Sequence, residues 1–331
     1  MAPLPSAGDG GGALVQAEAE ILSGVVRRPG SGAGFSRWLR KVWSFRVVYL
    51  MLLPFLVGFF LFTILPVVAG LAISLTSYNI LQPPVWVGLQ NFKELFLYDN
   101  VFIIGVRNTL VYGLVTGPIG LLLSFFFAWT INRVRLSWRV PLTLALYAPS
   151  LQSGITVGLI AGYFLATDQY GLFNFWLYRM GLIHQPVTWL QNPKLIMPVL
   201  IGITLWMSMG TGFLIFLSGL QTVKPDLYEA ARVDGIRNAW QELFYITMPQ
   251  MKPFLLINGI LAVVGSFGGS GLLGLAGGIN SPDYAAMSVS DYAGDYAGTR
   301  FMMGYAAAIS VVMFVWSYGL GRLLLNWLRE K

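Results

Sequence analysis

Long apolar stretches alternate with short polar segments along this chain. Six stretches contain no Asp, Glu, Lys or Arg: 47–76, 108–131, 140–166, 195–220, 253–276 and 301–321. A helix needs about 20 consecutive apolar residues to cross a hydrocarbon core of about 30 Å, and it satisfies its own backbone hydrogen bonds there. The pattern therefore predicts an all-α integral membrane protein with six transmembrane helices.

The distribution of basic residues predicts the orientation of these helices. All but five of the 21 Lys and Arg lie before the first stretch or in the segments after the second, fourth and sixth. The exceptions are Lys93, Arg107, Arg179, Lys194 and Arg300. Because short loops rich in Lys and Arg stay in the cytoplasm, we expect both termini to be cytoplasmic. Residues 47–331 would then form one six-helix transmembrane domain.

The segment before the first stretch, residues 1–46, differs in composition from the rest. Its first 34 or so residues are mostly Gly, Ala, Pro and Ser, whereas aromatic and basic residues alternate over 35–46. We expect a flexible cytoplasmic tail, followed by a basic and aromatic juxtamembrane segment at the membrane interface. A short surface helix within 13–26 is the alternative. The tail lacks a basic leading region, which argues against a cleaved signal peptide.

Composition narrows the possible chemistry. Charged residues make up 11% of the 331 positions, against about 25% in an ordinary soluble domain. The basic residues form no single stripe, so we expect the lipid bilayer and not nucleic acid as a partner. Cysteine is absent and His184 is the one histidine, with no other metal-binding side chains clustered beside it. We therefore predict no metal site and no catalytic residue.

The polar segment 221–252 carries helix signals of its own. Pro225 suits a first helical turn, with Asp226 beside it, and Gly235 can end that helix in a left-handed conformation. A second short helix is expected from Asn238, with Gln241 completing a capping box. Its apolar residues share one face: Trp240, Leu243, Phe244 and Met248. Two short helices at an angle would make a plug for a groove on another protein.

Seven residues of this segment carry a family resemblance. They are Glu229, Ala230, Ala231, Asp234, Gly235, Ile246 and Pro249. Their spacing resembles the "EAA" loop of permease subunits in binding-protein-dependent ABC importers. The resemblance implies that these residues couple the chain to a nucleotide-binding subunit.

Looser motifs resemble the carbohydrate, maltose-type branch of that superfamily. They are 86–92 (WVGLQNF), 108–110 (NTL), 170–174 (YGLFN), 219–221 (GLQ) and 303–308 (MGYAAA). The resemblance implies a sugar, and specifically an oligosaccharide, as cargo. It also implies three kinds of partner: a homologous second permease subunit, ATP-binding cassette subunits and an extracytoplasmic sugar-binding protein.

The energy source is expected outside this chain. The sequence contains no G-x-x-x-x-G-K-[ST] motif, so ATP and Mg are expected in the partner subunit and no cofactor in this one. The predicted helices also lack the charged residues that proton- or sodium-coupled carriers usually keep. A secondary transporter is thus a weaker alternative, and it would leave the loop unexplained. A permease of the same superfamily for another solute, such as a polyamine, is the nearer one.

A sugar path through the membrane should combine aromatic rings with amide and hydroxyl groups. The candidates in the third, fourth and fifth predicted helices are Tyr147, Gln152, Trp206, Ser208, Asn258 and Ser270. The alternative role of such polar residues is to join helices by hydrogen bonds. Gln152 and Asn258 are the strongest candidates, because an amide is costly in lipid without a partner.

The chain also carries regularly spaced glycines and a repeated tetrapeptide. Glycines recur at four-residue spacing in 113/117, 154/158 and 265/269, which predicts close helix packing. On the predicted outer face, the tetrapeptide Asp-Tyr-Ala-Gly at 291–294 is repeated at 295–298. We expect a solvated loop there, and the alternative is a docking patch for the binding protein.

Overall fold

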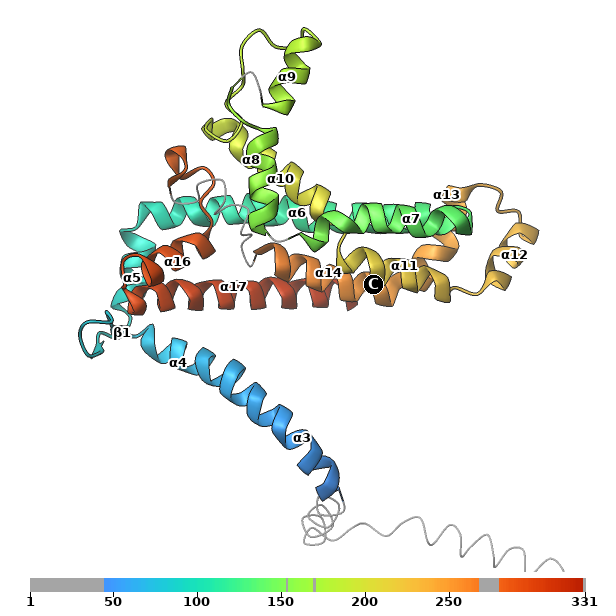
Figure 1. Cartoon of the computed structure of the whole chain (residues 1–331). Helices are drawn as coiled ribbons and strands as arrows, with labels where there is room; N and C mark the ends of the chain where they lie inside the picture. The colour runs from blue at the N-terminus through green and yellow to red at the C-terminus, as the bar shows by residue number, and fades with distance from the viewer. Residues whose placement is uncertain (1–44, 153, 169–170, 268–279, 330–331) are drawn as a thin grey trace, which may run out of the picture. The chain divides into compact units, whose positions relative to one another are not determined.

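A computed structural model describes residues 45–152, 154–168, 171–267 and 280–329 of the chain (Figure 1). The candidate Ser270 lies outside these residues, as does the predicted tail. The chain divides into two compact units, residues 1–67 and 68–331. Every site discussed below belongs to the second unit.

The first apolar stretch is one long helical segment. α3 (Arg46–Phe59) continues through a π-helical turn (Phe60–Ile64) into α4 (Leu65–Ile73), which crosses the unit boundary. Pro66 is the second residue after the π turn. Proline has no N–H to donate and its ring clashes with a carbonyl one turn earlier, so the wider turn accommodates it without a break.

α6 (Asn100–Arg133) is the central helix of the second unit. It packs against α10 (Pro193–Met207), α11 (Thr211–Thr222) and α14 (Met248–Phe267). A Cβ built on Gly113 would lie 2.6 Å from the ring of Phe267, and one on Gly117 would lie 3.0 Å from the Ser266 hydroxyl. The predicted close packing at 113/117 is therefore confirmed. At Gly265 a Cβ would meet open space, so the prediction is wrong there.

The third apolar stretch is not the continuous helix that we predicted over 140–166. α7 (Leu136–Tyr147) passes into a 3-10 turn (Ala148–Leu151), and α8 (Gly154–Phe164) follows. The two halves meet at an angle of 98°. Pro149 accounts for the end of the α-helix, because it supplies no N–H and restricts the residue before it. α9 (Leu172–Arg179) lies in the segment between α8 and α10.

Two other predicted helices differ in outline. The fourth breaks between α10 and α11, where Gly210 has φ −94° and ψ −136°. Before the fifth, α12 (Pro225–Val233) stands alone, while α13 (Ala239–Glu242) runs through a π turn (Leu243–Thr247) into α14. The last helix, α17 (Met303–Arg329), packs on α14. By length and composition, the described residues contain five helices able to cross a membrane, or six if the bent pair is one span.

Short elements cap the end of the second unit opposite α12, around the starts of α6 and α17 (Figure 1). They are strands β1 (Thr76–Ser77) and β2 (Val85–Trp86), α5 (Gln90–Leu97), a 3-10 turn (Pro282–Tyr284) and α16 (Val289–Gly298). The antiparallel pair β1 and β2 makes the all-α prediction wrong in this detail. The expectation of a solvated loop over 291–298 is also wrong, because these residues lie in helix α16. Their four-residue repeat is close to the helical period of about 3.6 residues.

Candidate functional site

α12 begins and ends as its sequence predicts. Pro225 occupies the first turn with Asp226 beside it, and Gly235 follows the helix with φ +93°. The N–H of Ile236 donates to the Ala231 carbonyl at 2.9 Å, and the N–H of Gly235 donates to the Arg232 carbonyl at 3.2 Å. These two bonds form a Schellman motif, which satisfies carbonyls at the helix end.

The second predicted helix of the segment 221–252 begins correctly but does not end where expected. Asn238 and Gln241 form the predicted capping box. However, α13, the π turn and α14 are contiguous, so the prediction of a separate second short helix is wrong: these residues form the N-terminal extension of α14. Pro249 lies just after the π turn, which relieves its clash as at Pro66. A 3.1 Å hydrogen bond joins the hydroxyls of Tyr228 and Thr247, so α12 is tied to this turn.

Charged and aromatic side chains, which the sequence analysis missed, join this segment to α6. Glu242 pairs with Arg133 at the end of α6, and its Oε1 lies 3.7 Å from Nε of Arg232 in α12. The Arg133 guanidinium lies 4.7 Å from the centre of a Trp129 ring, and Trp240 packs on Trp129 at 5.4 Å. One carboxylate thus links α6, α12 and α13. The sequence signal for this contact was Arg133, a basic residue just after the second apolar stretch. Sequence alone does not pair Arg133 with Glu242.

Exposure divides the seven loop residues into two groups. Glu229, Ala230, Asp234, Gly235 and Pro249 are exposed, whereas Ala231 is buried and Ile246 is half-buried. The predicted apolar face of the second helix also turns inward in part. Its Leu243 belongs to the main core cluster and Met248 packs against that cluster, while Trp240 and Phe244 remain half-exposed. The surface available to a partner therefore includes α12 and its C-terminal turn, with Val233 88% exposed, and also the π turn, with Phe244 58% and Tyr245 73% exposed.

Two of the path candidates line a cavity of about 550 Å³ between α6, α10, α11 and α14. Asn258 is 3% exposed and its amide donates to the Gly212 carbonyl at 3.0 Å. The Ser208 hydroxyl donates to the Leu205 carbonyl, and the Ser208 carbonyl accepts from the Ser124 hydroxyl at 3.0 Å. Further polar and aromatic groups on the wall are Tyr112, Thr116, Thr204, Thr211, Phe216 and Ser266. The cavity wall thus carries hydroxyls and one amide, while the Tyr112 and Phe216 side chains are fully buried.

Gln152 and Trp206 line a different, apolar cavity of about 300 Å³ beside α8 and α10. Both side chains are exposed, Trp206 by 54%. Tyr147 is half-buried at the end of α7 and lines neither cavity. The structure therefore separates the predicted candidates into two pairs.

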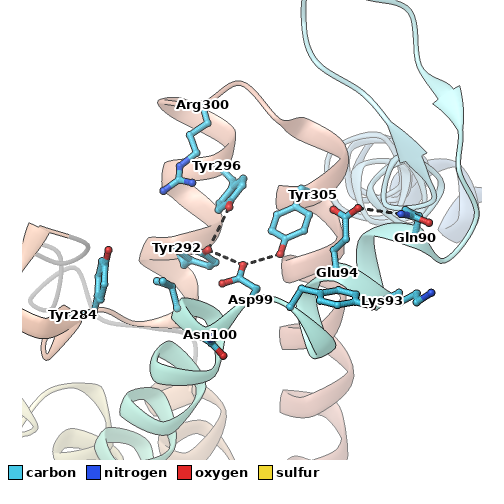
Figure 2. Close-up of a pocket in the computed structure, with 12 residues that line it drawn as sticks. Gln90, Lys93, Glu94, Asp99, Asn100, Tyr284, Tyr292, Tyr296, Arg300 and Tyr305 are labelled. Carbon is cyan, nitrogen blue, oxygen red and sulfur yellow. Dashed lines mark hydrogen bonds between the residues drawn. The ribbon is translucent and has the colours of Figure 1, made fainter.

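A third and larger hollow of about 900 Å³ lies between α5, α16 and the starts of α6 and α17 (Figure 2). We call it the outer pocket, after the side of the membrane on which the sequence predicts it to lie. Asp99 lies at its centre. One oxygen of this carboxylate accepts the hydroxyls of Tyr292 and Tyr305, each at 2.7 Å, and the other accepts the N–H of Phe102 at 2.9 Å. Asp99 therefore caps α6 and joins it to α16 and α17. Sequence reasoning missed it, although an Asp before a helix is an N-cap signal.

Known proteins share the sequence pattern of this chain. The family model described as "Binding-protein-dependent transport system inner membrane component" matches residues 30–329. The chain belongs to this family. Together with its apolar helices, this makes it a multi-pass membrane permease component, and such components are not themselves enzymes.

Individual relatives of this permease component span most of its length. The "Probable ABC transporter permease protein YesP" of Bacillus subtilis is 33% identical over 81% of this chain and 85% of its own. The arabinooligosaccharides transport system permease protein AraP of the same organism is 29% identical over 89% and 93%. The trehalose/maltose transport system permease protein MalF of Thermococcus litoralis is 30% identical over 81% and 88%.

A solved structure supports the fold of this permease component. A chain from a bacterial ABC transporter that imports the acidic polysaccharide alginate superposes with a TM-score of 0.77. The match covers 89% of this chain and 99% of the other, at 23% identity. At that identity the likeness establishes the fold alone.

Proposed function

We propose that this chain is one permease subunit of an ATP-driven importer and moves a sugar delivered by an extracytoplasmic binding protein. ATP would be hydrolysed, with Mg, by separate ATP-binding cassette subunits, and a homologous permease subunit would complete the pore. The observation that carries the proposal is α12. In a member of this family it is an independently capped helix whose Glu229, Ala230 and Gly235 are exposed.

The cargo is inferred from two independent observations. Several relatives carry the name of a sugar cargo: arabinooligosaccharides, lactose, polygalacturonan and rhamnogalacturonan, and trehalose and maltose. The 550 Å³ cavity combines hydroxyls, one amide and aliphatic side chains, which suit the hydroxyls and C–H faces of a sugar. We further propose that both termini and α12 face the cytoplasm, because basic residues gather there.

Reconstitution tests this proposal directly. The chain is co-expressed with the permease, ATPase and binding-protein genes of its own system, and proteoliposomes are assayed for uptake of arabinotriose, lactose, trehalose, maltose and spermidine. We expect ATP-dependent uptake of at least one sugar and none of spermidine. Uptake of spermidine alone, or of no compound, would contradict the sugar assignment. Failure of an ATPase subunit to co-purify would contradict the importer itself.

A further inference from the structure

The outer pocket has the size and position of a ligand site but belongs to neither membrane cavity. Its volume of about 900 Å³ falls in the range of about 300–1,000 Å³ that small-molecule sites occupy. None of its lining residues lines the two cavities that hold the path candidates. By the predicted topology it lies on the side from which the cargo arrives.

The lining chemistry suits a polyhydroxylated ligand better than a simple ion. Five tyrosines line the pocket: Tyr98, Tyr284, Tyr292, Tyr296 and Tyr305. Its charged groups are Lys93 and Arg300 against Glu94 and Asp99, so the formal charges balance. Amides from Gln90 and Asn100 add donors and acceptors. Rings for C–H faces, together with amides and ionised groups for hydroxyls, are what a sugar unit requires.

The tyrosine wall is held rigidly. The Tyr296 ring lies 4.9 Å from that of Tyr292 and 4.6 Å from that of Tyr305, and the Arg300 guanidinium lies 4.3 Å from its centre. Burial, with Tyr296 and Asp99 nearby, raises the pKa of the Tyr292 phenol above its ordinary range, so its hydroxyl stays protonated and donates to Asp99. A wall fixed in advance loses little entropy when a ligand binds.

Unusual backbone conformations border the pocket on two sides. The non-glycine residues with positive φ in the described part of the chain are Asp283 at 54°, Tyr284 at 56° and Phe301 at 57°. Tyr284 lines the pocket and Phe301 follows Arg300, which also lines it. The Asn108 amide donates a hydrogen bond to the Tyr284 carbonyl at 2.8 Å. Such conformations are strained and cluster at ligand sites, where the surroundings enforce them.

We infer that the outer pocket binds a sugar unit of the transported saccharide, before or as it enters the membrane cavity. Tyr284 would supply an accessible ring, since it is 38% exposed, and Lys93 an accessible donor. The buried Tyr292 and Tyr305 would shape the wall without contacting the ligand through their rings. This inference rests on the proposed sugar cargo.

Saturation-transfer NMR on the whole complex in lipid nanodiscs, without binding protein, tests the inference. The probe is arabinotriose, lactose, trehalose or maltose, whichever the wild-type complex takes up most strongly. Wild type is compared with Tyr284→Ala, Lys93→Ala and a control, Tyr178→Ala. Tyr178 is a 61% exposed tyrosine of α9 that does not line the pocket. Co-purification of all subunits and an unchanged melting temperature show that each variant is folded.

We expect the control to bind like wild type, and Tyr284→Ala and Lys93→Ala to weaken binding at least several-fold. Equal binding by wild type and both pocket variants would overturn the inference, as would a wild-type complex that binds none of the sugar it transports. Reduced uptake with unchanged sugar binding would also overturn it, because the pocket would then serve docking of the binding protein. Absence of any sugar uptake by wild type would instead refute the proposed function.

Discussion

Several residues that carried the family resemblance hold loops in place and do not line a membrane cavity. The Asn91 amide donates to the carbonyls of Ser74 and Thr76 at 2.8 and 2.9 Å. Asn174, 1% exposed, donates to Ala166 and accepts the indole N–H of Trp189 at 2.9 Å. A buried amide must find such partners, and at Asn91 and Asn174 these partners are groups of neighbouring loop segments.

The same reasoning separates two of the path candidates by experiment. Asn258→Ala removes a buried amide that donates to the half-buried Gly212 carbonyl, and such a hydrogen bond contributes about 0.5–1.5 kcal/mol of stability. Gln152→Ala changes an exposed side chain, and surface changes usually stay within about 0.5 kcal/mol. We therefore expect a lower melting temperature of the purified complex for Asn258→Ala only. Reduced sugar uptake by Gln152→Ala at an unchanged melting temperature would support a place for Gln152 on the sugar path. Unchanged uptake would show that Gln152 does not contribute to the path.

At the scale of elements, hydropathy located every apolar segment but not the interruptions within them. The breaks at Pro149 and Gly210 and the π turns before Pro66 and Pro249 are local backbone events inside uniformly apolar sequence. These interruptions leave the average hydropathy of each apolar stretch unchanged, so the hydropathy pattern does not reveal them. Capping signals were more informative: Pro225, Gly235 and Asn238 all take their predicted roles, because each acts through its own backbone geometry.

The ion pairs at Glu242 give a prediction about α12. Glu242→Gln removes the charge that Arg133 and Arg232 share, and partly exposed pairs contribute about 0.2–1 kcal/mol each. We expect faster amide hydrogen exchange in α12 and the turn after it, with no change in α10. The matched control is Glu94→Gln, which alters an exposed carboxylate near the opposite end of α6. Equal exchange in α12 for both variants would show that these pairs do not hold the element.

Across the whole molecule, membrane character and family followed from sequence, whereas tertiary contacts did not. The Asp99 contacts join residues nearly 200 positions apart along the chain, as 99 to 292 and 99 to 305. Nothing in the spacing of these residues predicts their pairing. Likewise, the path candidates looked like one group, yet helix packing places two of them in each of two cavities and Tyr147 in neither.

The proposed orientation predicts the labelling of single cysteines, and the chain has none of its own. Asn280 is exposed on the side proposed to be outer, whereas the neighbouring Ser281 is only 6% exposed and would label poorly. We expect an impermeant thiol reagent to label Asn280→Cys in intact cells and Val233→Cys only after permeabilisation. The reverse pattern would invert the topology.

Coupling through α12 is the central claim, and substrate-stimulated ATP hydrolysis by the reconstituted complex tests it most directly. Gly235→Val forces an L-residue into a conformation that costs it about 1–2 kcal/mol, whereas Gly235→Asn tolerates it better. Glu229→Ala removes an exposed charge of α12. Because the exposed turn buries no core, we expect normal membrane assembly for all three variants. The account predicts greatly reduced stimulation for Gly235→Val, intermediate stimulation for Gly235→Asn and reduced stimulation for Glu229→Ala; full stimulation with normal uptake in Gly235→Val and Glu229→Ala would contradict it.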